Sequence, residues 1–328
     1  MNTNTMVLIQ LGECKLYLIA SPLNYQYVLD VQSRYPQFAT IVSGEMDNSY
    51  GRLFVLSAVE LDNSRASLLF PADSFAPKQF FIDLVNAYRN YNRAHSLGFL
   101  GTVKDNSFFS FARPLYGSKE AGEFYRGDRE REAHNTFYAL VIEEHAASLY
   151  IRLLLHLLFI AACWHVERGG LYLHSSAVWR SADKGFLFLG ASGNGKTTVA
   201  TLSVEAGYGA LGDDLNFVVK QQNGYKLAAA PSIVQSLPGY SMVSPSLRGI
   251  FRLVKDDYDE LKPIPPLEIS KYLLESLKQI PKASLLTDET FQRAFSTVAS
   301  IARCVPGYEL HFRKTKDFWN LIDKQFPD

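Results

Sequence analysis

The residues best suited to chemistry lie in a glycine-rich loop, residues 190–198, with the sequence GASGNGKTT. It matches the phosphate-binding pattern G-x-x-x-x-G-K-[ST] without a mismatch. In this pattern, backbone N–H groups and the start of the next helix hold anionic oxygens, the lysine reaches the β- and γ-phosphates, and the following hydroxyl ligates Mg²⁺. The sequence therefore predicts binding of ATP with Mg²⁺. The candidate nucleotide-binding residues are Gly190, Ser192, Gly193, Asn194, Gly195, Lys196, Thr197 and Thr198.

A pair of aspartates, Asp213 and Asp214, follows this loop in the sequence and forms the second candidate group. One carboxylate can hold Mg²⁺, and the other can accept a proton from an attacking hydroxyl, as phosphoryl transfer requires. The alternative is a solvated turn in which both aspartates accept from backbone amides. His174 lies upstream of the loop on a predicted strand, where a structural role is the alternative to a catalytic one.

The elements that would position these residues can be predicted from local patterns. An apolar strand over residues 185–189 leads into the loop, and a helix over residues 198–206 leaves it and ends at Gly207. A strand over residues 171–179 turns back through five polar or small residues, 181–185. A connection this short makes an antiparallel hairpin.

A second hairpin is predicted after the aspartate pair. Asn223-Gly224 separates strand-like runs at residues 215–222 and 225–228. The expected nucleotide core is therefore α/β with an α+β tendency, rich in antiparallel pairs and not fully parallel.

Together these motifs resemble the HPr kinase/phosphorylase family and its relatives, which share a core with ATP-dependent phosphoenolpyruvate carboxykinase. In that group a Leu-His strand leads by a hairpin into the phosphate loop, and an Asp-Asp pair follows the loop helix. Here these elements stand at residues 173–176, 190–197 and 213–214, and residues 305–312 resemble a strand near the family's C-terminus. The strong resemblance covers residues 171–231.

The resemblance implies a kinase that moves the γ-phosphoryl group of ATP onto a hydroxyl. Asp213 matches the family's acid/base aspartate, Asp214 matches a residue on the metal side with Thr197, and His174 matches a histidine close to the transferred phosphate. True HPr kinases carry an E-x-R-G-x-G element where this chain has residues 231–240, without that Glu or Arg. The chain therefore resembles the looser relatives, which include kinases beside modified-peptide gene clusters and kinases of small hydroxyl compounds.

The composition narrows the class of protein. Acidic and basic residues balance at 33 each, which argues against nucleic-acid partners and against an anionic membrane surface. The three cysteines have no paired spacing, which favours a reducing cytoplasm. The apolar segment 147–166 is long enough to span a membrane, but Arg152 in its middle favours an amphipathic helix of a soluble protein.

Two domains are expected: a smaller mixed α+β domain over residues 1–135 and an HPr kinase-like nucleotide-binding domain over residues 136–328. In the first, strands are predicted at residues 6–10, 16–20 and 53–59, a helix near Pro77, and a linker over residues 91–135. In the second, residues 238–302 are expected to form a helical insertion, with a break at residues 262–266 and helices at residues 268–279 and 288–302.

The predicted function is a Mg-ATP-dependent kinase whose acceptor is a serine of a peptide or protein, or a small hydroxyl metabolite. A non-catalytic or ATP-hydrolysing nucleotide-binding regulatory module is the main alternative, and a carboxykinase-type lyase is a second one. A homo-oligomer is left open. A cation beyond Lys196 is expected to stabilise the transferred phosphoryl group. The candidates are Arg248, Arg252, Arg303 and Arg313.

Overall fold

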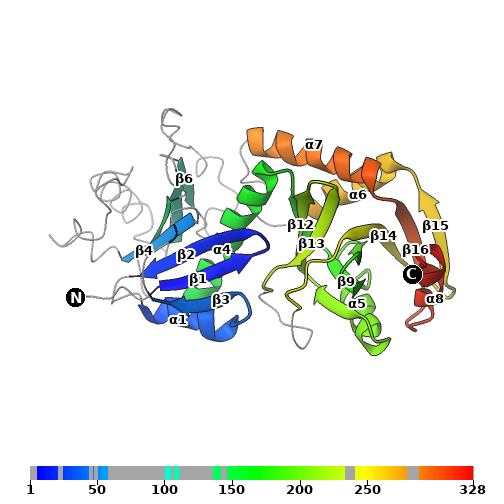
Figure 1. Ribbon diagram of the computed structural model, residues 1–328, viewed down its shortest axis with the longest axis horizontal. Helices are drawn as coiled ribbons and strands as arrows, with labels where there is room; N and C mark the ends of the chain where they lie inside the picture. Colours follow the sequence, from blue (N-terminus) through cyan, green and yellow to red (C-terminus); the bar gives the residue numbers. More distant parts are fainter. Residues whose placement is uncertain are drawn as a thin grey trace, which may run out of the picture. The chain divides into compact units, whose positions relative to one another are not determined.

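The structure is a computed structural model of mixed α/β architecture (Figure 1). It describes residues 6–20, 25–43, 47, 51–57, 100–104, 107–110, 136–141, 146–232, 241–278 and 288–327. The chain forms two compact units. The first contains Met1–Gln10 and Cys14–Leu157, and the second contains Leu11–Glu13 and Leu158–Asp328.

A seven-stranded sheet with the order β3-β1-β2-β4-β7-β5-β6 forms most of the first unit. Its elements are β1 (Met6–Leu11), β2 (Cys14–Ala20), α1 (Tyr25–Arg34), β3 (Ala39–Val42), β4 (Gly51–Ser57), β5 (Leu100–Lys104), β6 (Ser107–Ser110) and β7 (Thr136–Val141). The three strands predicted in this region are confirmed. The helix predicted near Pro77 lies outside the described residues.

The linker predicted over residues 91–135 is wrong where β5 and β6 stand. These short strands form an antiparallel hairpin, and β5 also pairs with β7. Polar and glycine-containing surroundings concealed them, because strands of four or five residues carry little periodicity of their own. β7, which begins at the predicted domain boundary, pairs with β4 and β5 in this sheet.

Two further sheets form the second unit. A six-stranded sheet has the order β11-β9-β10-β14-β16-β15, and a three-stranded sheet has the order β13-β12-β8. The strands are β8 (Leu171–His174), β9 (Ser176–Ser181), β10 (Lys184–Leu189), β11 (Gly209–Gly212), β12 (Leu215–Gln221), β13 (Gly224–Ala229), β14 (Leu247–Lys255), β15 (Glu260–Ile264) and β16 (Gly307–Phe312).

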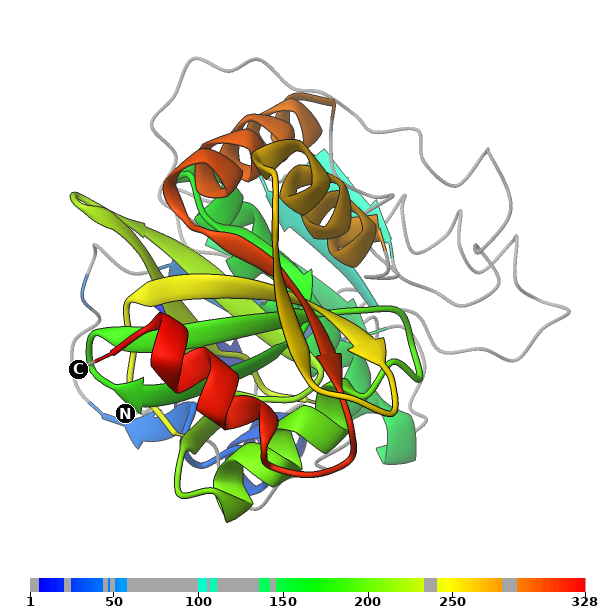
Figure 2. The same cartoon turned by 90° about the vertical axis from the view of Figure 1, so that its right-hand side faces the viewer.

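The helices of this unit are α4 (Ala146–Glu167), which begins in the first unit, α5 (Lys196–Glu205), α6 (Pro266–Lys278), α7 (Asp288–Cys304) and α8 (Phe318–Gln325). Figure 2 shows α6 and α7 on one side of the strands and α5 and α8 on the other. Among the described residues, no helix is long and apolar enough to cross a membrane.

At two neighbouring places, between β8 and β9 and between β11 and β12, the chain leaves one sheet of the second unit and enters the other. β8 pairs with β12 in the three-stranded sheet, and β9 pairs with β11 in the six-stranded sheet. The single strand predicted over residues 171–179 is therefore wrong in one respect, because it breaks at Ser175. The Ser175 N–H donates to the Asp214 carbonyl at 2.9 Å, which ties this break to the matching break between β11 and β12.

The predicted hairpins are confirmed. β9 and β10 pair antiparallel, and so do β12 and β13. The register pairs Gln221 with Gly224, so Gln222 and Asn223 form the turn and Gly224, at φ +121°, begins β13. The helix after the loop ends as expected, with Gly207 at φ +90° and its N–H donating to the Val204 carbonyl.

The helical insertion predicted over residues 238–302 is wrong in its first part. β14 lies between β10 and β16 and is parallel to both, and β15 is the edge strand beyond β16. The predicted break at residues 262–266 falls partly inside β15, where an edge strand tolerates Pro263. The two predicted helices are confirmed as α6 and α7.

One core of the second unit lies between the six-stranded sheet and helices α5 and α8. It contains large buried side chains from the strands, such as Phe188 and Phe251, and from α8, such as Phe318 and Trp319. The Trp319 indole N–H donates to the Ser203 hydroxyl of α5 at 3.1 Å. This packing fixes α5, and with it the loop that precedes the helix, against the carboxyl end of β10.

Candidate functional site

The glycine-rich loop connects β10 to α5, as the motif predicts. Gly193 and Gly195 adopt φ values of +85° and +98°, a region that favours glycine. A Cβ atom at Gly195 would lie 2.7 Å from Phe312 Cζ, so the loop also approaches β16 too closely for a side chain. The two glycines are therefore required by the shape of the loop.

Lys196 is buried at the start of α5 and folds back over the loop. Its ammonium donates to the carbonyls of Gly190 at 2.8 Å and Ala191 at 3.3 Å. Burial lowers the pKa of Lys196, while the carboxylates of Asp214 and Asp213 oppose that shift. The loop lysine and the aspartate pair are therefore close enough to interact electrostatically.

The aspartate pair lies where β11 leaves the six-stranded sheet and β12 enters the three-stranded sheet. Asn216 holds this corner: its buried amide donates to the Ser175 carbonyl at 2.8 Å, the Ser175 hydroxyl at 3.2 Å and the Gly212 carbonyl at 3.4 Å. Asn216 thus links the break between β8 and β9 to the break between β11 and β12. The two aspartates lie in the second of these breaks.

Asp214 is the more exposed member of the pair, with 41% of its side chain accessible. His174 Nε2 lies 3.3 Å from Asp214 Oδ1, and the Ser232 hydroxyl donates to Oδ2 at 3.2 Å. The hydrogen bond from His174 is the main cause that lowers the pKa of Asp214, and burial opposes it. The charge of His174, the Ser232 hydrogen bond and Lys196 lower it further. Asp214 is therefore held as a carboxylate.

Asp213 is buried, with 3% of the residue accessible. The aromatic side chain of Tyr172 is also buried, and burial followed by the negative charge of Asp214 raises its pKa well above the ordinary value. Of the two aspartates, Asp213 is thus the buried one, and Asp214 is the more accessible one although it lies close enough to the buried Tyr172 to affect its pKa.

The structure places His174, Lys196, Asp213 and Asp214 in one region, as the sequence predicts. It adds two residues that the sequence did not indicate. Ser232 contacts Asp214, and Ser276 of α6 donates its hydroxyl to the His174 carbonyl at 2.7 Å. No local pattern marks either serine, since both reach the site from elements distant in the sequence.

Thr197 is exposed in the first turn of α5 and Thr198 is half-buried beside it. No group of three or more His, Cys, Asp or Glu side chains in the described parts of the chain is arranged to hold a metal ion. A Mg²⁺ ion bound to ATP needs few protein ligands, because phosphate oxygens and water complete its coordination. The two ligands that the sequence predicts, the Thr197 hydroxyl and the Asp214 carboxylate, are oxygen donors of the kind that Mg²⁺ prefers.

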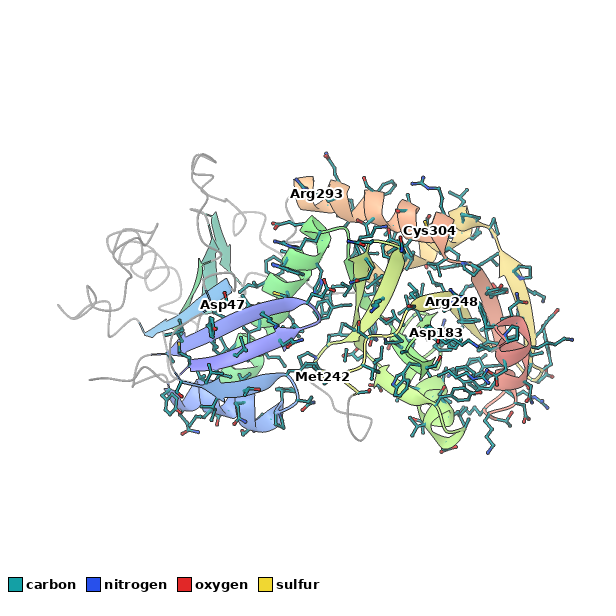
Figure 3. The ribbon with its side chains drawn as sticks, viewed as in Figure 1. Asp47, Asp183, Met242, Arg248, Arg293 and Cys304 are labelled. Carbon is teal, nitrogen blue, oxygen red and sulfur yellow. The ribbon has the colours of Figure 1, made fainter. Side chains whose placement is uncertain are left out.

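Three of the four candidate arginines lie near the ends of β14 or β16. Arg248 lies near Asp183 at the β9–β10 turn, at the amino end of β14 (Figure 3). Arg313 donates from Nε and from an Nη atom to Asp259 Oδ2 at 2.9 and 2.7 Å. Arg303 is exposed in the last turn of α7.

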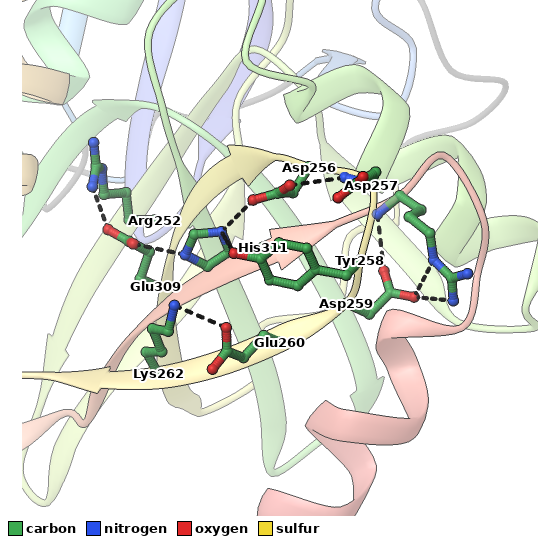
Figure 4. Close-up of polar contacts among 10 residues, drawn as sticks. Arg252, Asp256, Asp257, Tyr258, Asp259, Glu260, Lys262, Glu309 and His311 are labelled. Carbon is green, nitrogen blue, oxygen red and sulfur yellow. Dashed lines mark hydrogen bonds and ion pairs between the residues drawn. The ribbon is translucent and has the colours of Figure 1, made fainter.

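Arg252 belongs to a polar network on β14 and β16 (Figure 4). It forms an ion pair with Glu309, and its guanidinium lies 4.7 Å from the ring centre of Tyr272 on α6. His311 lies between two carboxylates, with Nε2 at 2.9 Å from Glu309 and Nδ1 at 2.9 Å from Asp256. Arg252 thus already has a carboxylate partner, and both ring nitrogens of His311 are engaged by carboxylates.

Comparison of the sequence with curated proteins finds no significant match. A family model described as SynChlorMet cassette protein ScmC matches residues 142–327, which include α4 and nearly all of the second unit. The matched region contains the glycine-rich loop, the aspartate pair, His174 and the residues that hold the corner. Because the match covers more than half of the chain, the protein belongs to the ScmC family.

Proposed function

We propose that this protein is a Mg-ATP-dependent kinase with an HPr kinase-like core, which transfers the γ-phosphoryl group to a hydroxyl. The observation that carries the proposal is the meeting of Lys196, the aspartate pair and His174 at the corner between two sheets. A phosphate-binding loop alone is common to many nucleotide-binding proteins. A carboxylate pair beside its lysine is what phosphoryl transfer additionally needs.

In the proposed mechanism, the backbone of residues 193–197 and Lys196 bind the β- and γ-phosphates. When bound, Mg-ATP would supply the γ-phosphoryl group, with ADP as the leaving group, and a metal ion that offsets the charge of the phosphate oxygens. Asp213 would accept the proton of the acceptor hydroxyl. Thr197 and Asp214 would hold the Mg²⁺ ion of the nucleotide. His174 holds Asp214 in place, since its Nε2 lies 3.3 Å from the carboxylate.

The acceptor class follows from the proposed resemblance: a serine of a peptide or protein, or a small hydroxyl metabolite. The test is transfer of labelled γ-phosphate from Mg-ATP to serine peptides and to a metabolite extract. Asp213→Asn is expected to lower transfer about 100- to 10,000-fold while the affinity for Mg-ATP stays within about threefold.

Asp214→Asn is the matched control, because it removes the neighbouring carboxylate. Normal transfer by Asp213→Asn together with lost transfer by Asp214→Asn would mean that Asp214, and not Asp213, accepts the proton. ATP hydrolysis that no acceptor stimulates would instead favour the regulatory nucleotide-binding module. Wild-type protein that binds no nucleotide would refute both functions.

A further inference from the structure

Three parallel strands of the second unit end at one edge of the six-stranded sheet. β10, β14 and β16 are neighbours, and the glycine-rich loop directly follows β10. Lys255 is the last residue of β14 and pairs with Phe312, the last residue of β16. The carboxyl ends of parallel strands are where ligands of such sheets bind. The strand order thus places a lysine beside the loop.

Contacts with the loop support this placement. The Cβ position of Gly195 lies 3.5 Å from Lys255 Cε, and the ammonium is one bond farther along the side chain. Lys255 is exposed, and it forms no ion pair within the part of the chain that the structure describes. Two of the acids that follow it in the sequence are engaged elsewhere, Asp256 with His311 and Asp259 with Arg313.

The charges of the site create a need for such a cation. The site sets two carboxyl groups, those of Asp213 and Asp214, against the one ammonium of Lys196, whereas the ligand of the loop is a polyanion. Arg252 and Arg313 already have carboxylate partners, and Arg248 lies at the opposite end of β14. Lys255, in contrast, has its side chain beside Gly195 of the loop.

We infer that Lys255 is a second nucleotide-contacting cation, which places its ammonium against the phosphate chain held by the glycine-rich loop. This inference rests on the proposed function. A charge-assisted hydrogen bond of this kind strengthens binding without any covalent step. The sequence did not indicate this residue, because residues 247–255 were expected to belong to a helical insertion, where a lysine has no special place.

The test is the affinity of Lys255→Met, Lys255→Arg and wild-type protein for Mg-ATP and Mg-ADP, measured by calorimetry at two salt concentrations. Methionine keeps an unbranched side chain of similar length against Gly195 and removes only the charge. Lys324→Met is the matched control, because this exposed residue of α8 has the same charge and α8 ends near the amino end of the sheet.

Lys255→Met is expected to bind both nucleotides roughly 10- to 100-fold more weakly, and the loss should shrink at high salt. Lys255→Arg should bind within about threefold of wild type, and Lys324→Met should bind like wild type. Wild-type affinity in Lys255→Met, or a loss independent of salt, overturns the inference alone. Wild-type protein that binds neither nucleotide overturns the proposed function together with it.

Discussion

At the scale of single residues, the candidate site combines charges that are individually costly to bury. Lys196 is buried among groups that the folded chain holds at fixed distances, and burial lowers its pKa. Because folding disfavours its charged form, Lys196 destabilises the nucleotide-free protein below its folded-state pKa. This cost disappears as the pH rises above the ordinary value near 10.4.

Lys196→Met is therefore expected to leave the melting temperature of the nucleotide-free protein equal or raise it by a few degrees, and to abolish binding of Mg-ATP. Calorimetric melting with and without the nucleotide would measure both effects. A clearly lower melting temperature without nucleotide would mean that the hydrogen bonds to Gly190 and Ala191 outweigh the cost of burial.

The charged form of Asp214, unlike that of Lys196, stabilises the folded protein. Its pKa lies below the ordinary value, with the His174 hydrogen bond as the main cause, so its contribution to stability is present above about pH 4. This contribution is lost as the pH falls through the folded-state pKa. Because much of the carboxylate is accessible to solvent, the contribution is small.

His174→Ala is expected to lower the free energy of unfolding by about 0.5–1 kcal/mol at pH 6, and the difference from wild type should shrink below pH 4. Urea unfolding at several pH values would test this. A difference that persists at the lowest pH would assign the stabilisation to packing of the imidazole.

At the scale of elements, two strand pairs pass between sheets at Ser175 and at the aspartate pair. Nothing local in the sequence marks the change of sheet at Ser175, because the residues on both sides favour strands. The glycine and aspartates at residues 212–214 do mark a break, but not that the chain enters another sheet there. The glycine-rich loop, its helix and the two hairpins were predictable, since each depends on neighbours within a few residues. β14 was missed because its partners β10 and β16 are remote in the sequence, and a short apolar run fits a buried helix as well as a strand.

The residues of the candidate site also divide into those that the sequence could predict and those that it could not. His174, Lys196 and the aspartate pair belong to motifs and could be predicted, whereas Ser232, Ser276 and Lys255 depend on which elements pack together. For Ser232 and Ser276 no motif exists. For Lys255 the signal was weak: Ile250, Phe251 and Val254 favour a strand, and only a strand over residues 247–255 would have placed Lys255 at its end.

The contact between the loop and β16 gives a prediction about elements. Gly195→Ala is expected to cost about 2–4 kcal/mol of stability, because the left-handed backbone and the buried Phe312 ring both oppose a Cβ atom. Gly207→Ala has a similar φ value but meets no atom within 4 Å, and should cost about 1 kcal/mol. Chemical unfolding of both variants checks this difference. Equal costs would show that the loop yields to the added methyl group.

At the scale of the whole molecule, the chain consists of two compact units. A ligand stabilises only the unit that binds it, by an amount that depends on its concentration relative to Kd. The candidate site lies entirely within the second unit, since all of its residues follow Leu158.

Thermal unfolding is therefore expected to show two transitions, of which Mg-ATP raises only one. At a nucleotide concentration 100 times Kd, the free energy of unfolding of the second unit should rise by about 2.7 kcal/mol. Differential scanning calorimetry over a nucleotide titration would measure the shift. A single transition that moves as a whole would show that the two units unfold together.

The approach of Phe312 to Gly195 also has a consequence for the order of events during synthesis. The glycine-rich loop leaves the ribosome more than a hundred residues before the ring that lies against it. Domains fold as units once their elements are complete. A nascent chain that has exposed the loop but not β16 therefore lacks one wall of the proposed phosphate site, and we expect the proposed nucleotide not to assist the early stages of folding.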